Sequence, residues 1–142
     1  MKRLIAGGLL LLTAACANSF STTYKGAGPA SEALSWSKQA QARHETLASE
    51  ASPQDAQAIS KVRVYIDSIP AELTVDGTTI GVKEGIGAVL LGQVRVIATM
   101  KVPSEEEAIP VMQRVAFAGG ANLAYCPTEG MGHRCYLVRT AE

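Results

Sequence analysis

The 142-residue sequence is poor in the side chains that most catalytic and metal sites require. It has two histidines, His44 and His133, and three cysteines, Cys16, Cys126 and Cys135. A nucleophilic site needs a histidine held beside a nucleophile and oriented by a third group, and these two histidines offer no such arrangement. His44 lies among polar residues, so we expect its side chain to be solvated. The sequence therefore predicts a protein that is not an enzyme.

A charge excess and a second long apolar run are also lacking. Lys and Arg number 13, and so do Asp and Glu. Nucleic-acid binding needs an excess of basic side chains on one face, so no nucleic-acid partner is expected. Residues 86–100 are apolar but interrupted by glycine, glutamine and arginine, unlike the ~20 apolar residues of a spanning helix. The glycines between 81 and 92 do not have phosphate-loop spacing, and no cofactor is expected.

The N-terminus has the order of a bacterial export signal. Met1-Lys2-Arg3 is followed by the largely apolar residues 4–12 and then by small residues that end at Cys16. The apolar stretch is about half of the ~20 residues that cross a bilayer, so it suits a cleaved signal better than a permanent helix. We predict a signal peptide over residues 1–15.

Small residues directly before a cysteine resemble the lipobox of bacterial lipoproteins, in which that cysteine is acylated and becomes the first residue of the mature chain. Here it would be Cys16. Ordinary cleavage after Ala17 is the alternative, because Ala15 and Ala17 also satisfy the small-x-small rule. Ala17 rather than aspartate follows the cysteine, and by resemblance to enterobacterial sorting this predicts the outer membrane. The domain would then face the periplasm or the cell surface.

Residues 16–60 are rich in Ser, Ala, Thr and Gln and have few large apolar side chains. Such a composition is too poor in apolar residues to build a core, so we predict a lipid-anchored, partly helical tether. Its helices would cover residues 30–50 and start again at Ser52-Pro53. As a flexible coil, roughly 44 residues would reach about 35–40 Å. We interpret Trp36 as docking the tether helix onto the domain, with a partner-binding anchor as the alternative.

Residues 61–142 predict a small α+β domain, an antiparallel sheet with one packed helix. Residues 62–67 alternate in the manner of a half-buried strand. Asp76-Gly77 predicts a hairpin over residues 73–80 with a type I′ turn, which would place Leu73 opposite Ile80. A long strand at about 88–101 has the apolar content of a central strand, and residues 123–126 and 134–140 would pair as the last two strands.

A helix is predicted between these strands. Ser104 and Glu107 have capping-box spacing, and one helical face carries Ala108, Val111, Met112, Val115 and Ala118. Pro110 predicts a kink or a late start, since proline removes a helical hydrogen bond. The acidic run 105–107 could supply a general acid or base. We interpret it instead as favourable charge in the first turn of the helix.

Cys126 and Cys135 flank a segment containing Pro127, Gly130 and Gly132. Such a turn lets two strand ends approach to disulfide distance, so we predict a bond between them. In an oxidising compartment the odd cysteine, Cys16, is then the lipid anchor. The alternative is a metal or thiol-redox site made of Cys126, His133 and Cys135, although zinc would want a fourth ligand.

The order of these landmarks resembles the RcsF-like outer-membrane lipoproteins, which are envelope-stress sensors, and related small lipoproteins. The matching pieces are Cys16, Val62-Arg63-Val64-Tyr65, Leu91-Gly92-Gln93-Val94, Gly120-Ala121-Asn122, Cys126 and Cys135-Tyr136. That family has four cysteines in two crossing bridges, whereas this domain has two. The resemblance implies the fold and the outer-membrane address. The export signal, the tether, the compact domain and the lack of catalytic groups predict a non-catalytic protein-interaction role, in stress sensing or envelope assembly, with partners among other envelope proteins.

Overall fold

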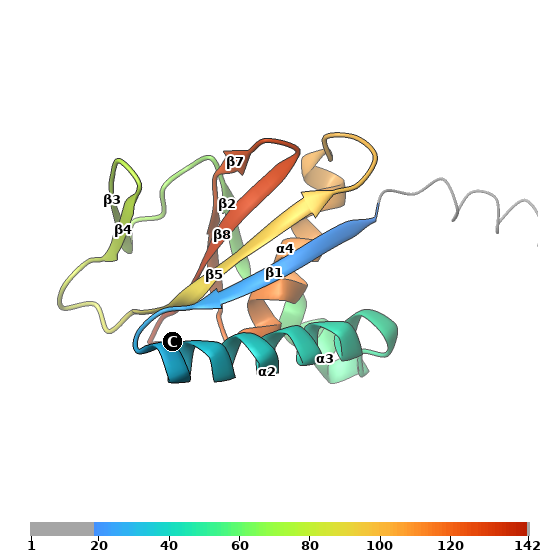
Figure 1. Cartoon of the computed structure of the whole chain (residues 1–142), viewed down its shortest axis with the longest axis horizontal. Helices are drawn as coiled ribbons and strands as arrows, with labels where there is room; N and C mark the ends of the chain where they lie inside the picture. The colour runs from blue at the N-terminus through green and yellow to red at the C-terminus, as the bar shows by residue number, and fades with distance from the viewer. Residues whose placement is uncertain (1–18, 142) are drawn as a thin grey trace, which may run out of the picture.

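A computed structural model describes residues 19–141 of the chain (Figure 1). The predicted signal peptide, Cys16 and the alternative cleavage position at Ala17 lie outside the described residues. In chain order the elements are β1 (Phe20–Gly26), α2 (Ala30–Ser49), α3 (Pro53–Ser60), β2 (Arg63–Ile66), β3 (Leu73–Asp76), β4 (Thr79–Val82), β5 (Val89–Ala98), α4 (Glu105–Ala118), β6 (Leu123–Cys126), β7 (Thr128–Glu129) and β8 (Gly132–Arg139).

The main sheet has six strands in the order β1-β5-β8-β6-β2, with β7 paired to β8. All its pairs are antiparallel except that of β2 with β6, which is parallel. The long strand β5 is an interior strand, as its apolar content predicted, and β6 pairs with β8 as expected. The α+β class is therefore confirmed, and the sheet is mostly antiparallel with helices packed on it.

Residues 20–60 are part of this fold rather than a tether. Strand β1 pairs with β5 along its whole length, from Phe20 opposite Ala98 to Gly26 opposite Gly92, and α2 crosses the sheet beside α4 (Figure 1). The expected boundary at residue 61 and the long flexible reach are therefore wrong. The small number of large apolar residues suggested a tether, but small or amphipathic side chains make the packing contacts here. Tyr24 is 7% exposed and Ala40 is 2% exposed.

Helices α2 and α4 cover one face of the sheet, the helix face, and the main core lies beneath them. Met112 and Val115 of α4 are fully buried against Val94 and Leu137 of the sheet. The helix α4 starts at the predicted capping box, where the Ser104 hydroxyl accepts from the Glu107 amide. The late start suggested by Pro110 is therefore wrong, because α4 runs through this exposed proline.

The hairpin of β3 and β4 lies over the opposite, outer face, where Leu73 packs with Leu123, Tyr125 and Val138. Its register differs from the prediction, since Leu73 pairs with Val82 rather than Ile80. The two turn residues are Gly77 and Thr78. Gly77 alone has positive φ, at 61°, and glycine in the first turn position is what a type II′ turn requires, whereas type I′ needs positive φ twice.

Candidate functional site

The predicted disulfide between Cys126 and Cys135 is present and joins the last residue of β6 to the interior of β8. Both cysteines are fully buried in the core of the helix face. The ring of His133 is also buried, with Nδ1 3.3 Å from the Cys126 carbonyl oxygen. Across residues 19–141, no three His, Cys, Asp or Glu side chains are grouped to hold a metal. A metal site using these cysteines would first require reduction of the bond, because metals bind the thiolate.

His44 is buried rather than solvated, with 8% of its surface exposed. It lies on the inner face of α2 with Ala40 and Leu47, four residues after one and three residues before the other. The prediction of a solvated side chain was wrong because it considered the polar neighbours in sequence and not this helical spacing. Its ring centroid is 6.4 Å from that of Tyr24, and within the described part of the chain its Nδ1 has no hydrogen-bond partner. Burial, reinforced by the charge of Arg114, lowers the pKa of His44 below its ordinary value.

Trp36 docks α2 onto the domain, as predicted. Its indole Nε1 donates to the Gly119 carbonyl oxygen at 3.0 Å, and its ring meets that of Tyr24 edge-on at a centroid distance of 5.7 Å. Gly92 and Gly119 make room for the indole, because a Cβ at either position would approach the ring within 2.7 and 2.9 Å respectively. The need for glycine at these two positions, neither of which has positive φ, is therefore explained by the space that the Trp36 ring occupies.

The best candidate for a functional site is a cavity of about 480 Å³ between the hairpin and the outer face, here called the hairpin groove. The hairpin contributes Val75 and Ile80, while β6 and β8 contribute Tyr125 and Tyr136. These two rings stack with centroids 6.1 Å apart and planes inclined by 23°. The groove therefore combines an aromatic floor with an apolar wall.

Polar side chains of the hairpin groove are held in fixed positions by one another. Arg134 donates from Nε and Nη2 to the two carboxylate oxygens of Glu129, at 2.7 and 2.9 Å, and from Nη1 to Gln93 at 2.6 Å. The paired guanidinium lowers the pKa of Glu129, and Arg95 lies 3.4 Å from the same carboxylate. Because their hydrogen-bonding groups are engaged, these side chains give a rigid rim rather than a free charge.

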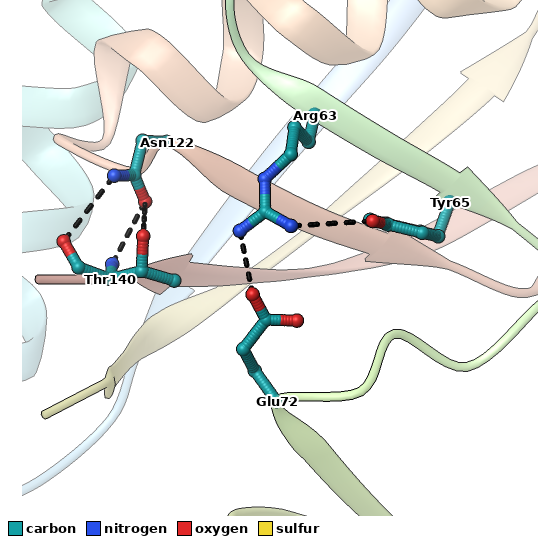
Figure 2. A network of polar contacts seen from close by, with 5 residues as sticks. All are labelled: Arg63, Tyr65, Glu72, Asn122 and Thr140. Atoms are coloured by element: carbon teal, nitrogen blue, oxygen red, sulfur yellow. Dashed lines mark hydrogen bonds and ion pairs between the residues drawn. The ribbon is translucent and has the colours of Figure 1, made fainter. Parts of the chain in front are cut away.

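A second polar group ties the start of the hairpin to the sheet (Figure 2). Arg63 of β2 donates to the Glu72 carboxylate at 2.7 Å and to the Tyr65 hydroxyl at 3.3 Å. The hydrogen bond from Arg63 lowers the pKa of Glu72. Asp67, at φ 56°, accepts from the Thr128 amide at 2.7 Å and from its hydroxyl at 2.5 Å. These contacts fix the loop that carries the hairpin over the outer face.

The hairpin groove was not predicted from the sequence, although a row of tyrosines indicates it once the order of the strands is known. Tyr65, Tyr125 and Tyr136 occupy strand positions that face the same way, because Tyr65 pairs with Tyr125 and Tyr125 pairs with Tyr136. Three of the four tyrosines of the chain therefore form a row across β2, β6 and β8. Only the order of the strands reveals this row, since Tyr65 is far from the others in sequence.

No family model, curated protein or solved structure matches the chain. None of the helices in residues 19–141 has the length and apolar character to cross a membrane.

Proposed function

We propose that this chain is a bacterial envelope lipoprotein, acylated on Cys16 and held at the outer membrane, whose domain is a non-catalytic protein-interaction module. The observation that carries the proposal is the hairpin groove, with its tyrosine floor and its paired Arg134. Tyrosine and arginine are enriched where proteins bind one another most strongly, because they combine large contact area with directional polar groups. The export signal and the resemblance to RcsF-like lipoproteins support a partner in the envelope.

A rigid groove suits a protein segment that brings an apolar or aromatic side chain. Val75, Ile80 and the two stacked rings would bury such a side chain, while the Arg134 and Gln93 rim would fix the direction of the bound segment. The rim groups are already ordered, so binding would cost little side-chain entropy.

The domain would be held close to the membrane. With Cys16 as the anchor, three residues lie between it and Phe20, and the four residue-to-residue steps span at most about 14 Å in an extended chain. The partner would therefore be a membrane-anchored or membrane-associated protein rather than one deep in the periplasm. Mass spectrometry of the mature N-terminus tests the anchor, which requires an acylated Cys16. A chain starting at Asn18 would refute it.

Site-specific photo-crosslinking in living cells tests the interaction itself. A photoreactive residue at Thr78, on the rim of the groove, should give a discrete adduct with an envelope protein, and one at the exposed Ala48 of α2 should not. The identified partner, once purified, should bind the chain at least tenfold more weakly when Tyr136→Ala is introduced. The proposal fails if Thr78 gives no adduct, if both positions give the same adducts, or if Tyr136→Ala binds like the parent.

A further inference from the structure

A second cavity, of about 390 Å³, lies away from the hairpin groove and is here called the basic pocket. It opens where α3 and α4 end and where β8 finishes. Its lining includes Arg43 of α2, Lys61 directly after α3 and Arg139 of β8, and residues 19–141 contribute no carboxylate to it. In a chain with as many acidic as basic side chains, three cations around one cavity are a local concentration of charge.

None of these three cations is used in an ion pair within residues 19–141. The ion pairs there involve other basic residues, namely Arg63, Arg95, Lys101 and Arg134. The Arg43 guanidinium lies 4.7 Å from the centre of the Phe117 ring and makes one long contact, 3.5 Å, to the Phe117 carbonyl oxygen. Like charges at close range repel, and an anion between them would remove that cost.

The walls of the basic pocket are fixed by hydrogen bonds. Asn122 accepts from the Thr140 amide at 2.8 Å and donates to the Thr140 carbonyl oxygen at 3.3 Å, which holds the strand end that carries Arg139 (Figure 2). Gly120, with φ 85°, turns the chain out of α4 beside it, and its amide donates to the Phe117 carbonyl oxygen. The pocket is therefore a built feature rather than a chance gap between mobile side chains.

The lining also sets the chemistry of the ligand. Guanidinium and ammonium groups bind phosphate oxygens, with arginine able to donate two parallel hydrogen bonds. Phe117, Val62 and Ala121 add apolar surface beside the cations, which bare inorganic phosphate would leave unused. The volume lies at the lower end of the ~300–1,000 Å³ range for small-molecule sites.

We propose that the basic pocket binds an organic phosphate, with the phosphate oxygens between Arg43, Lys61 and Arg139 and the uncharged part against Phe117. This site is separate from the hairpin groove and does not depend on the interaction proposed there. The competing explanation is that Lys61 and Arg43 only stabilise the negative ends of helices α3 and α4. That explanation predicts an effect on stability and no phosphate binding.

Calorimetric titration of the full chain in micelles of an uncharged detergent tests the proposal. The probes are glycerol 3-phosphate, a phosphomonoester, and glycerophosphoglycerol, a lipid headgroup without its acyl chains. We expect at least one to bind with a submillimolar Kd, and Lys61→Gln/Arg139→Gln to weaken it at least tenfold. Lys38→Gln/Lys83→Gln removes two cations outside the pocket and should change the Kd less than twofold. Preference for the diester would indicate a membrane lipid as the source, and preference for the monoester a soluble phosphate.

Three results would overturn the proposal. The first is a Kd above about 1 mM for both probes, and the second is equal weakening by the two double variants, which would indicate nonspecific attraction. The third is a lower melting temperature of Arg43→Gln/Lys61→Gln without phosphate binding by the parent, as the helix-end explanation requires. Tyr136→Ala, in the hairpin groove, should leave phosphate affinity unchanged, so failure at one site can be told from failure at the other.

Discussion

The two faces of the main sheet are covered in different ways. On the helix face, α2 and α4 bury Val94, Met112 and Leu137 completely. On the outer face the short hairpin covers only part of the sheet, and Arg134 and Tyr136 stay half-buried beside a cavity. A closely packed face contributes most to the free energy of folding, whereas a partly covered face can admit another molecule. The helix face is therefore where we expect the largest losses of stability, and the outer face is where the proposed partner contact lies.

The largest expected effect tests the helix face. Met112→Ala removes most of a side chain with no exposed surface, and such truncations cost about 2–5 kcal/mol in unfolding free energy. At about 4 °C per kcal/mol for a domain of this size, the melting temperature should fall by roughly 8–20 °C. Met131→Ala, at a position 43% exposed, is the matched control and should melt within about 3 °C of the parent. A Met112 variant as stable as this control would show that the helix face is loosely packed.

The covalent link on the helix face should have the next largest effect. Replacing both cysteines, Cys126→Ala/Cys135→Ala, releases a short loop, and by the chain-entropy estimate its closure is worth about 2–3 kcal/mol. Melting followed by circular dichroism should show a fall of about 10 °C. Thiol counting on the unfolded, unreduced parent should detect neither cysteine. Parent-like melting of the double variant, or free thiols at these positions, would contradict a structural role for the bond and favour the redox alternative.

The sequence was most informative where local signals agreed. The capping box at Ser104 and the apolar spacing of Met112 and its neighbours located α4, and the only two cysteines of the predicted domain indicated the bond. Strand β1 was missed because its alternation uses threonine and tyrosine rather than large aliphatic residues, and its partner β5 lies some 70 residues later. Long-range pairing of this kind leaves no local pattern.

The hairpin groove and the basic pocket were missed for the same physical reason. Arg43, Lys61 and Arg139 come from three distant elements, and only the packed fold brings them around one cavity. The predicted hairpin register was wrong because Asp76-Gly77 is compatible with two turns. The two turn residues can be Asp76 and Gly77, as predicted, or Gly77 and Thr78, as observed. A one-residue shift in turn position changes every cross-strand partner in the hairpin.

A smaller effect should separate the N-terminal part of the helix face from the rest. Trp36→Phe keeps an aromatic ring between Gly92 and Gly119 but removes the indole N–H that the Gly119 carbonyl oxygen accepts. Loss of one such hydrogen bond, with the acceptor left unpaired, should cost about 1–2 kcal/mol in a urea titration. Amide exchange should accelerate in β1 more than in β8. Leu34→Ala, on the exposed side of α2, is the control, and equal effects of the two changes would mean that Trp36 does not fasten this segment.

The smallest expected effect is a difference in how the two faces respond to acid. On the outer side, the ordinary pKa values of Asp67 and Glu72 are 3.8 and 4.5, and both are lowered by hydrogen bonds from Thr128 and Arg63 respectively. The unfolded chain therefore takes up protons before the folded chain does. The stabilisation is complete above these ordinary values and is lost as the pH falls through the lowered folded ones.

On the helix face, His44 affects stability at a higher pH than these carboxylates do, because the ordinary pKa of histidine is 6.5. Burial lowers the pKa of His44 below that value in the folded chain. Arg114 lowers it further, while Glu45 opposes the shift. Below pH 6.5 the unfolded chain binds a proton that the folded chain excludes, so stability should begin to fall there, before the carboxylates respond. Urea midpoints between pH 7.5 and 5.5 should therefore decline for the parent and decline less for His44→Leu, which fills this buried position with a side chain that cannot bind a proton. If His44→Leu and the parent lose stability in parallel over this range, the helix face does not sense mild acid through His44.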